Sequence, residues 1–496
     1  MRQSGTNPEE SVDPLESCKE GTPRLLCYFK WFDRAPKLIQ KILRLVIPFL
    51  VLIFFLLLPM NISNEIRAML AIFFCVALLW TLEPVPLAVT ALIVPVLLVA
   101  LGVATPVQSL QSFADPIIYL LMGGLIIAES FRVNGLDRRA ALYLVAKMGG
   151  DVRKVLLALM LVTTLLSMWI SNTATIALLL PVAAGVASKV VGQQPKVLAA
   201  FLLGMGMAGM FGGMATITGS PPNAIVAALI SQEEPFSFLN WMTMGVPVSI
   251  SLFAIAFFLL PRLMRISSQV IDIAQVHKEL VALGSWSHGE KSTLLIFFPT
   301  VLLWLLGDRL GGVFGLPSNF FVPAMVALLS SFLLFVVKAL KWEQAKGISW
   351  EIFLIVGAGL SLGKALEYTG TAALIADLIV MGFRGMSVIA MMIFVGVISV
   401  LITNFVSNTA SAAMLAPIMI GVSSALGIDP KYLALTVGFC VSLAIITPIG
   451  TPSMTLIYST GQVSRKAMAA AGLVVSALAV PLIVAIVYIM VNSGWA

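Results

Sequence analysis

Apolar runs of about 20 residues recur along the chain from Ile42 to the C-terminus, and short polar segments separate them. A run of this length is long enough to cross the hydrocarbon core of a bilayer as an α-helix. The sequence lacks the alternating short segments that are typical of an outer-membrane barrel. The pattern therefore predicts an all-α polytopic membrane protein.

The apolar runs predict about eleven transmembrane helices. Nine of these are continuous, and they lie at about residues 42–59, 66–82, 86–103, 115–133, 241–261, 293–306, 319–337, near 357–360, and 468–491. The other two are interrupted by Pro and Gly, at about residues 197–230 and 432–459. Two further runs, 155–188 and 387–425, are longer and contain polar residues at their centres, so neither is predicted to be a single span.

The same polar motif occupies the middle of both long runs. Ser171-Asn172-Thr173 recurs as Ser407-Asn408-Thr409, and Pro181 recurs as Pro417 with the same separation along the chain. A single copy would most simply be explained by hydrogen bonds between neighbouring membrane helices. Two copies at one offset, each followed by a Pro-broken span, instead indicate two halves of one binding site.

The charges beside the two runs predict that each folds as a re-entrant hairpin. The first run has Arg153 and Lys154 before it and Lys189 after it, whereas a single span should not have positive residues at both ends. Each arm of this hairpin has about 17 residues and is about 26 Å long. The second run has few positive flanking residues, which suits a hairpin that enters from outside. Opposite orientations of two units form the inverted repeat that is typical of secondary transporters.

The N-terminal segment sets the predicted orientation. Residues 1–41 lack the apolar core and cleavage site of a signal peptide, and they contain Lys30, Lys37 and Lys41 close to the first apolar run. Basic residues next to a span favour the cytoplasmic side. We therefore expect a cell-membrane protein with its N-terminus in the cytoplasm and, after eleven spans, its C-terminus outside.

The tips and the breaks offer neutral oxygen and nitrogen groups. The breaks read Gly219-Ser220-Pro221-Pro222-Asn223 and Gly450-Thr451-Pro452-Ser453. Exposed carbonyls, with Ser, Thr and Asn oxygens, are hard ligands for Na⁺, while helix N-termini and hydroxyl donors suit an anion. Neither tip and neither break contains Asp or Glu. This favours Na⁺ coupling, or exchange, over a carboxylate proton relay.

Composition argues against several other functions. Only 11% of the residues are charged, against about 25% in an ordinary soluble domain, and the net charge of +7 reflects basic loops between spans rather than a nucleic-acid partner. The sequence contains no phosphate-binding G-x-x-x-x-G-K-[ST] motif and no H-E-x-x-H motif, so neither ATP drive nor an intramembrane enzyme is expected. An ion channel would more usually have ring symmetry. The four cysteines are expected to be free thiols, and Glu129 is the one acidic residue that could lie deep enough to be functional.

These motifs resemble those of the divalent anion:sodium symporter (DASS) family. The resemblance covers about residues 42–491, and it includes the repeated Ser-Asn-Thr tips, both breaks, and Phe113-Ala114-Asp115-Pro116-Ile117-Ile118 followed by Gly123-Gly124. It implies a homodimer in which each protomer has a scaffold and a transport domain that moves as an elevator. One departure is the second break, Thr451-Pro452-Ser453-Met454, where the family commonly repeats Pro-Pro-Asn.

The resemblance also implies the roles of individual residues. One Na⁺ site would use Ser167, Ser171, Asn172 and Gly219, and the other would use Thr403, Ser407, Asn408 and Gly450. The substrate would lie between the tips, held by Ser171, Asn172, Thr173, Ser220, Ser407, Asn408, Thr409, Thr451 and Pro452. Na⁺ would be the coupling ion, and no organic cofactor is implied.

The chain is expected to divide into six segments. They are a cytoplasmic segment 1–41, scaffold segments 42–110 and 233–346, transport repeats 111–232 and 347–465, and a last transmembrane helix 466–496, with dimer contacts in 233–346. We expect a secondary active transporter that couples Na⁺ to the uptake of succinate-like C4 dicarboxylates. The same tips could also serve a Na⁺-independent dicarboxylate exchanger, or a transporter of sulfate or citrate.

Overall fold

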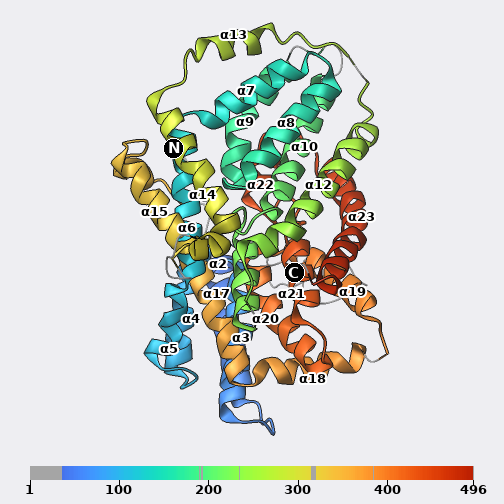
Figure 1. Cartoon of the computed structure of the whole chain (residues 1–496). Coiled ribbons are helices and arrows are strands. Elements are labelled where there is room, and N and C mark those ends of the chain that lie inside the picture. Colours follow the sequence, from blue (N-terminus) through green and yellow to red (C-terminus); the bar gives the residue numbers. More distant parts are fainter. Residues whose placement is uncertain are drawn as a thin grey trace, which may run out of the picture.

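The computed structural model describes residues 36–494, except for residues 189, 191–193, 234, 268, 314–319 and 384. Within these ranges the regular elements are helices, and one isolated antiparallel bridge joins Asp151 to Val270 (Figure 1). The all-α prediction is therefore confirmed. Residues 1–35 of the expected cytoplasmic segment 1–41, including Cys18 and Cys27, lie outside the described residues. Cys75 and Cys440 are buried free thiols.

The first half of the chain forms the elements up to α13. They are α2 (Lys37–Leu57), α3 (Asn64–Leu82), α4 (Leu87–Ala100), α5 (Pro106–Gln111), η1 (Ser112–Ala114), α6 (Pro116–Val133), α7 (Leu136–Met148), α8 (Val152–Ser167), α9 (Asn172–Ala187), α10 (Gln194–Met214), α11 (Pro221–Glu233), α12 (Phe238–Leu263) and α13 (Ala274–Ala282).

The second half forms the remaining helices. They are α14 (His288–Val313), α15 (Pro323–Val336), α16 (Trp342–Ala345), α17 (Glu351–Tyr368), α18 (Thr371–Phe383), α19 (Val388–Thr403), α20 (Asn408–Leu426), α21 (Pro430–Val441), α22 (Pro452–Ser459) and α23 (Arg465–Asn492).

The order of the helices repeats, and the repeat is longer than the sequence motifs indicate. Helices α8 and α19 each have 16 residues, and their first residues, Val152 and Val388, have the same separation along the chain as the two Ser-Asn-Thr motifs. Helices α4 and α15 each have 14 residues, and their first residues, Leu87 and Pro323, again have this separation. The repeated units therefore include the helices that precede the hairpins, and they run from α3 to α12 and from α14 to α23.

The two units interlock. Helix α11, which follows the first break, packs against α20 of the second hairpin, and α22, which follows the second break, packs against α9 of the first hairpin. Likewise α6 packs against α15, and α17 packs against α4. Figure 1 shows the hairpin α8–α9 near one end of the molecule and the hairpin α19–α20 towards the other. This exchange of contacts is what an inverted repeat produces.

Each unit bends sharply before its hairpin. Gly135 lies between α6 and α7 with φ +71°, and Gly370 lies between α17 and α18 with φ +73°. Glycine tolerates this left-handed conformation, which strains other residues. The bend between α17 and α18 is 76°. Helices α7 and α18 are therefore the arms through which each hairpin joins the rest of its unit.

Eight helices in the described part of the chain are long and apolar enough to cross a membrane, or nine if the bent pair α17–α18 is one span. The eleven spans expected from the sequence include α4, α15 and the broken pair α21–α22, which are not among these eight or nine. Helix α20 is among the eight, whereas the sequence predicts it to be an arm of a hairpin. A helix of 14 residues, such as α4 or α15, is only about 21 Å long, so helix length does not by itself identify these crossings. Helix α10 lies in the core with almost every residue buried, while α2 exposes apolar side chains along its length.

Candidate functional site

Both hairpin tips end in a serine at the N-terminus of the second arm. In the first hairpin α8 ends at Ser167 and α9 begins at Asn172, with Ser171 as its N-cap residue. In the second, Ser407 is the N-cap residue of α20. Serine at this position commonly caps the helix, but neither side chain makes a capping hydrogen bond here. Both hydroxyls and the first N–H groups of α9 are therefore available to a ligand, whereas in α20 the Thr409 N–H donates to the Asn408 side chain.

The first tip packs closely against the first break. The buried Ser167 hydroxyl donates to Asn172 Oδ1, and Asn172 Nδ2 lies 3.4 Å from Met210 Sδ. A Cβ atom on Gly213 would lie 2.8 Å from Asn172 Oδ1, and one on Gly219 would lie 2.6 Å from the carbonyl oxygen of Gly213. The structure thus gathers Ser167, Asn172 and Gly219, three of the four residues expected at the first Na⁺ site.

The second tip packs against the second break in the same way. Thr403 Oγ1 donates to the Val441 carbonyl oxygen at 2.6 Å, and a Cβ atom on Gly450 would lie 2.8 Å from the Thr403 carbonyl oxygen. Asn408 Oδ1 accepts a hydrogen bond from the Thr409 backbone N–H at 2.9 Å. Close approach at Gly219 and at Gly450 explains why both breaks carry glycine before the Ser or Thr that precedes proline.

One contact joins the two repeats at the tips. Thr173 Oγ1 of the first hairpin lies 3.1 Å from Ser453 Oγ of the second break. Thr451, the N-cap residue of α22, accepts from the Met454 backbone N–H at 3.4 Å. Among the residues expected to hold the substrate, Ser171 and Pro452 are exposed, Asn172, Thr173, Ser407 and Asn408 are partly exposed, and Ser220, Thr409 and Thr451 are buried.

The site is built from uncharged groups. In the described residues no group of three or more His, Cys, Asp and Glu side chains could hold a metal ion. A cation at the tips would therefore rest on hydroxyl, amide and main-chain oxygens, a donor set that suits Na⁺. An anion would meet hydroxyl groups and the first N–H groups of two helices.

Residues 37–495 match the model of the family described as "Sodium:sulfate symporter transmembrane region". This chain belongs to the sodium:sulfate symporter family. Its helices are accordingly those of a multi-pass membrane transporter, and it is not an enzyme.

Named relatives of this symporter-family chain match over most of its length. It is 32% identical over 451 residues to an uncharacterized transporter of Haemophilus influenzae, covering 88% of this chain and 95% of that protein. It is 30% identical over 478 residues to the sodium-dependent dicarboxylate transporter SdcS of Staphylococcus aureus, covering 92% and 91%. A crystal structure of the Alcanivorax borkumensis YdaH transporter matches with 17% identity and a TM-score of 0.49, over 78% of this chain and 88% of that one.

The sequence motifs of this transporter did not reveal all of the polar contacts at the breaks. Thr216 Oγ1 donates to the Met168 carbonyl oxygen at 2.5 Å, and Thr447 Oγ1 donates to the Asn404 carbonyl oxygen at 2.5 Å. A signal was present, because Thr216 and Thr447 stand at the same distance before the glycine of their break. Asn404 has no such signal, since all of its side-chain partners except Val400 lie on a later segment of the chain.

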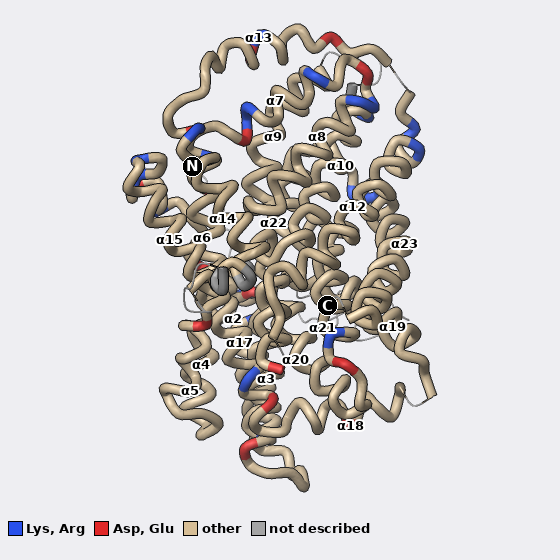
Figure 2. The backbone as a smooth tube through the Cα atoms, in the orientation of Figure 1, with Lys and Arg blue, Asp and Glu red and all other residues tan. Residues whose placement is uncertain are grey.

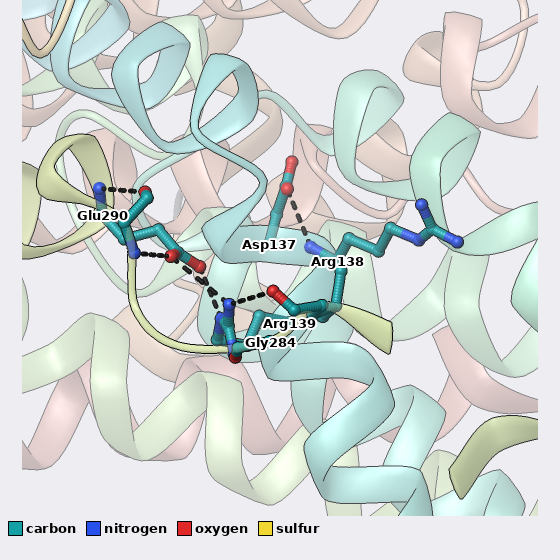
Figure 3. Close-up of polar contacts among 7 residues, drawn as sticks. Asp137, Arg138, Arg139, Gly284 and Glu290 are labelled. Atoms are coloured by element: carbon teal, nitrogen blue, oxygen red, sulfur yellow. Dashed lines mark hydrogen bonds and ion pairs between the residues drawn. The ribbon is translucent and has the colours of Figure 1, made fainter. Parts of the chain in front are cut away.

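Ion pairs join the first arm, α7, to neighbouring helices. Arg139 on α7 bonds Glu290 on α14 at 2.5 and 3.3 Å, and it donates to the Gly284 carbonyl oxygen at 3.1 Å (Figure 3). Burial raises the pKa of Asp137 on α7 to about 6. Glu129, the acidic residue that the sequence singled out, is buried and paired with Arg132.

Two cavities lie behind the hairpins rather than at the tips. One of about 360 Å³ lies between α7, α9 and α13 and is lined in part by Pro181 and Gly185. The other, of about 420 Å³, lies between α11, α17, α18 and α20 and is lined in part by Pro417 and Gly421. These residues are paired across the repeat, so the hairpin walls of the two cavities correspond, while the other walls differ. Neither cavity is lined by a tip residue.

Proposed function

We propose that this chain couples Na⁺ to the uptake of C4 dicarboxylates such as succinate. The observation that carries the proposal is the 3.1 Å contact between Thr173 and Ser453, because it brings the tip of one repeat to the break of the other. The names of the staphylococcal relatives, sodium-dependent dicarboxylate transporters, support the same coupling and substrate class.

The uncharged site suits a transported dianion. Hydroxyl and amide donors hold a carboxylate without a fixed counter-charge, so the anion can be released. Na⁺ ions bound beside the tips would supply the positive charge that the protein lacks there. Binding of anion and cation would then be mutually dependent, which is the thermodynamic requirement for symport.

We propose that the two hairpin units move together against a scaffold as an elevator. The glycine joints at Gly135 and Gly370 support this division, because each separates a hairpin from the helices that precede it. Helix α12 packs against α8, α10 and α23, so we assign it to the moving unit rather than to the scaffold segment 233–346. The scaffold would then retain α14 and α15 from that segment.

We further propose that the scaffold forms a homodimer through α14 and α15. Their outer faces expose Leu295, Phe298 and Phe332, each with more than 60% of its side chain accessible in the single chain. Such a face needs lipid or a partner to cover it. This location agrees with the dimer contacts expected in 233–346.

The charges favour the expected orientation. Lys and Arg residues gather at the end of the molecule that carries α7 and α13, whereas Asp and Glu residues are more frequent around α3 and α18 at the other end (Figure 2). The basic end would face the cytoplasm. The hairpin α8–α9 would then enter the membrane from the cytoplasm and α19–α20 from outside.

Uptake of labelled succinate into proteoliposomes tests the function. We expect an inward Na⁺ gradient to drive accumulation, and replacing Na⁺ by choline to abolish it. Uptake that needs internal dicarboxylate and ignores Na⁺ would instead show an exchanger. Competition by sulfate stronger than that by succinate would contradict the dicarboxylate assignment.

A further inference from the structure

The two repeats differ at a pair of positions, one in each hairpin tip and one after each break. One position is Met168 in the first hairpin and Asn404 in the second, which stand at the same distance before the Ser-Asn-Thr motif of their hairpin. The other is Asn223 after the first break and Met454 after the second, at the same distance from the proline that begins each helix. Each repeat therefore has one asparagine and one methionine, but their places are exchanged.

In the first repeat the amide comes from the helix that follows the break. Asn223 is completely buried, and its Nδ2 donates to the carbonyl oxygens of Gly213 and Thr216, both at 2.7 Å. The end of α10 and the start of the break are thus tied to one side chain of α11, the helix that follows the break. The amide oxygen, Asn223 Oδ1, is buried without a hydrogen-bond partner.

In the second repeat the amide comes from the hairpin tip. Asn404 is 2% exposed, and its Nδ2 donates to the Leu443 carbonyl oxygen at 3.2 Å. Its Oδ1 accepts hydrogen bonds from the backbone N–H groups of Ile446 at 2.9 Å and Thr447 at 3.2 Å. The hairpin therefore holds the break directly, and the amide oxygen is satisfied.

A shared contact shows that the positions are equivalent. Thr216 and Thr447 each donate to the main-chain oxygen at the exchanged hairpin position, Met168 in one repeat and Asn404 in the other, both at 2.5 Å. The backbone arrangement is the same, so the difference lies in the side chain. A buried polar group without a partner is costly, and in the structure this cost falls on the first repeat.

We propose that Asn223 and Asn404 are positioning residues that fix the two breaks, and that their exchange makes the two cation sites unequal. The second break is held to its hairpin before any cation binds. The first break, with an unpaired amide oxygen and no amide link to its tip, becomes ordered when Na⁺ binds. This inference deepens the proposed Na⁺ coupling and rests on it for the identity of the ion.

Hydrogen exchange of the full-length wild-type protein, in choline and in Na⁺ buffer, tests whether the two breaks are ordered to different degrees before Na⁺ binds. In choline we expect the amides of 442–451 to exchange at least about tenfold more slowly than those of 215–220. Na⁺ should slow exchange mainly at 215–220. Equal protection of both breaks in choline, or an effect of Na⁺ mainly on the second, would overturn the inference.

Relocating the amide tests the roles of the residues. Asn404→Met should raise the Na⁺ concentration for half-maximal succinate uptake by about tenfold, the equivalent of losing one to two hydrogen bonds. The double variant Asn404→Met/Met454→Asn, which gives the second repeat the arrangement of the first, should restore it to within about threefold. A single variant that behaves as wild type, or a folded double variant without rescue, would remove the positioning role. If uptake by the wild-type protein does not respond to Na⁺, the proposed coupling is contradicted. The difference in hydrogen-exchange protection between the two breaks in choline would still test whether Asn223 and Asn404 hold them unequally.

Discussion

The two arms, α7 and α18, have the same place in the repeat but different surroundings. Arg138 and Arg139 lie at the start of α7, and the positions on α18 at the same distance from the glycine joint are Ala373 and Leu374. Helix α7 is bonded to α13 and α14 through Glu279 and Glu290, whereas none of the ion pairs found in the described residues involves α18. The repeated backbone thus supplies two similar arms, and among the described residues the sequence differences give ion pairs only to the arm at the basic end.

The hairpin tips, unlike the arms, carry the same Ser-Asn-Thr motif in both repeats. Ser171-Asn172-Thr173 and Ser407-Asn408-Thr409 are identical, and so are the positions of Gly219 and Gly450 in their breaks. The two repeats are therefore alike at the proposed site and differ in the contacts that hold their arms. Each prediction below compares one repeat, or one contact, with its counterpart.

The largest effect is expected at the tips. Asn172→Ala and Asn408→Ala each remove an amide from the proposed cation and substrate site, so each should reduce succinate uptake by at least about 100-fold. Size-exclusion profiles should remain those of the wild type. Loss of uptake in only one of the two variants would show that the repeats do not contribute equally to the site.

The next effect concerns the stability of the first arm. The side chains of Arg139 and Glu290 are only 12% and 5% exposed, so Arg139→Ala should lower the stability by about 3 kcal/mol because it leaves a buried carboxylate unpaired. The matched variant Arg138→Ala breaks an exposed pair with Glu279 and should cost less than about 1 kcal/mol. Thermal unfolding in detergent measures both, and equal losses would contradict the difference between the pairs.

A smaller effect is expected from added methyl groups at the breaks. Gly219→Ala and Gly450→Ala would each place a Cβ atom within 2.8 Å of a backbone oxygen, so each should raise the Na⁺ concentration for half-maximal uptake by about tenfold. Gly185→Ala in α9 is the control, since its Cβ atom would meet nothing within 4 Å. An unchanged Na⁺ dependence in both break variants would separate the breaks from the cation sites.

The smallest effect is a pH dependence at the first arm. Burial raises the pKa of Asp137 to about 6, above its unfolded value near 4, with Arg132 lowering it and Glu129 raising it. The folded state then binds the proton more tightly, so this contribution to stability is present at low pH and is lost as the pH rises through 6. Wild-type protein should lose about 1 kcal/mol more than Asp137→Asn between pH 5 and 7. The same change in melting temperature with pH in both proteins would contradict this prediction.

The all-helical fold and the positions of the hairpin tips and breaks could be predicted because the Ser-Asn-Thr motif and the Gly-Ser/Thr-Pro breaks are polar motifs in an apolar sequence, while the roles of the tip residues stay a prediction. The correspondence between α4 and α15 could not be predicted from the sequence, because lipid-facing and core positions accept many different apolar residues. Few identical residues therefore mark the two helices as copies. The count of about eleven spans stays a prediction, because short helices and hairpin arms have similar lengths and helix length does not separate them. Asn223 and Asn404 were missed as a pair because their roles depend on contacts between separate segments.

Equilibrium binding of labelled succinate to the purified protein tests most directly whether the two repeats form one Na⁺-dependent site. We expect saturable binding in Na⁺, none in choline, and loss of binding in Asn172→Ala and in Asn408→Ala when each is made alone. Full binding by either variant in Na⁺, or wild-type binding in choline, would contradict a single site built by both tips.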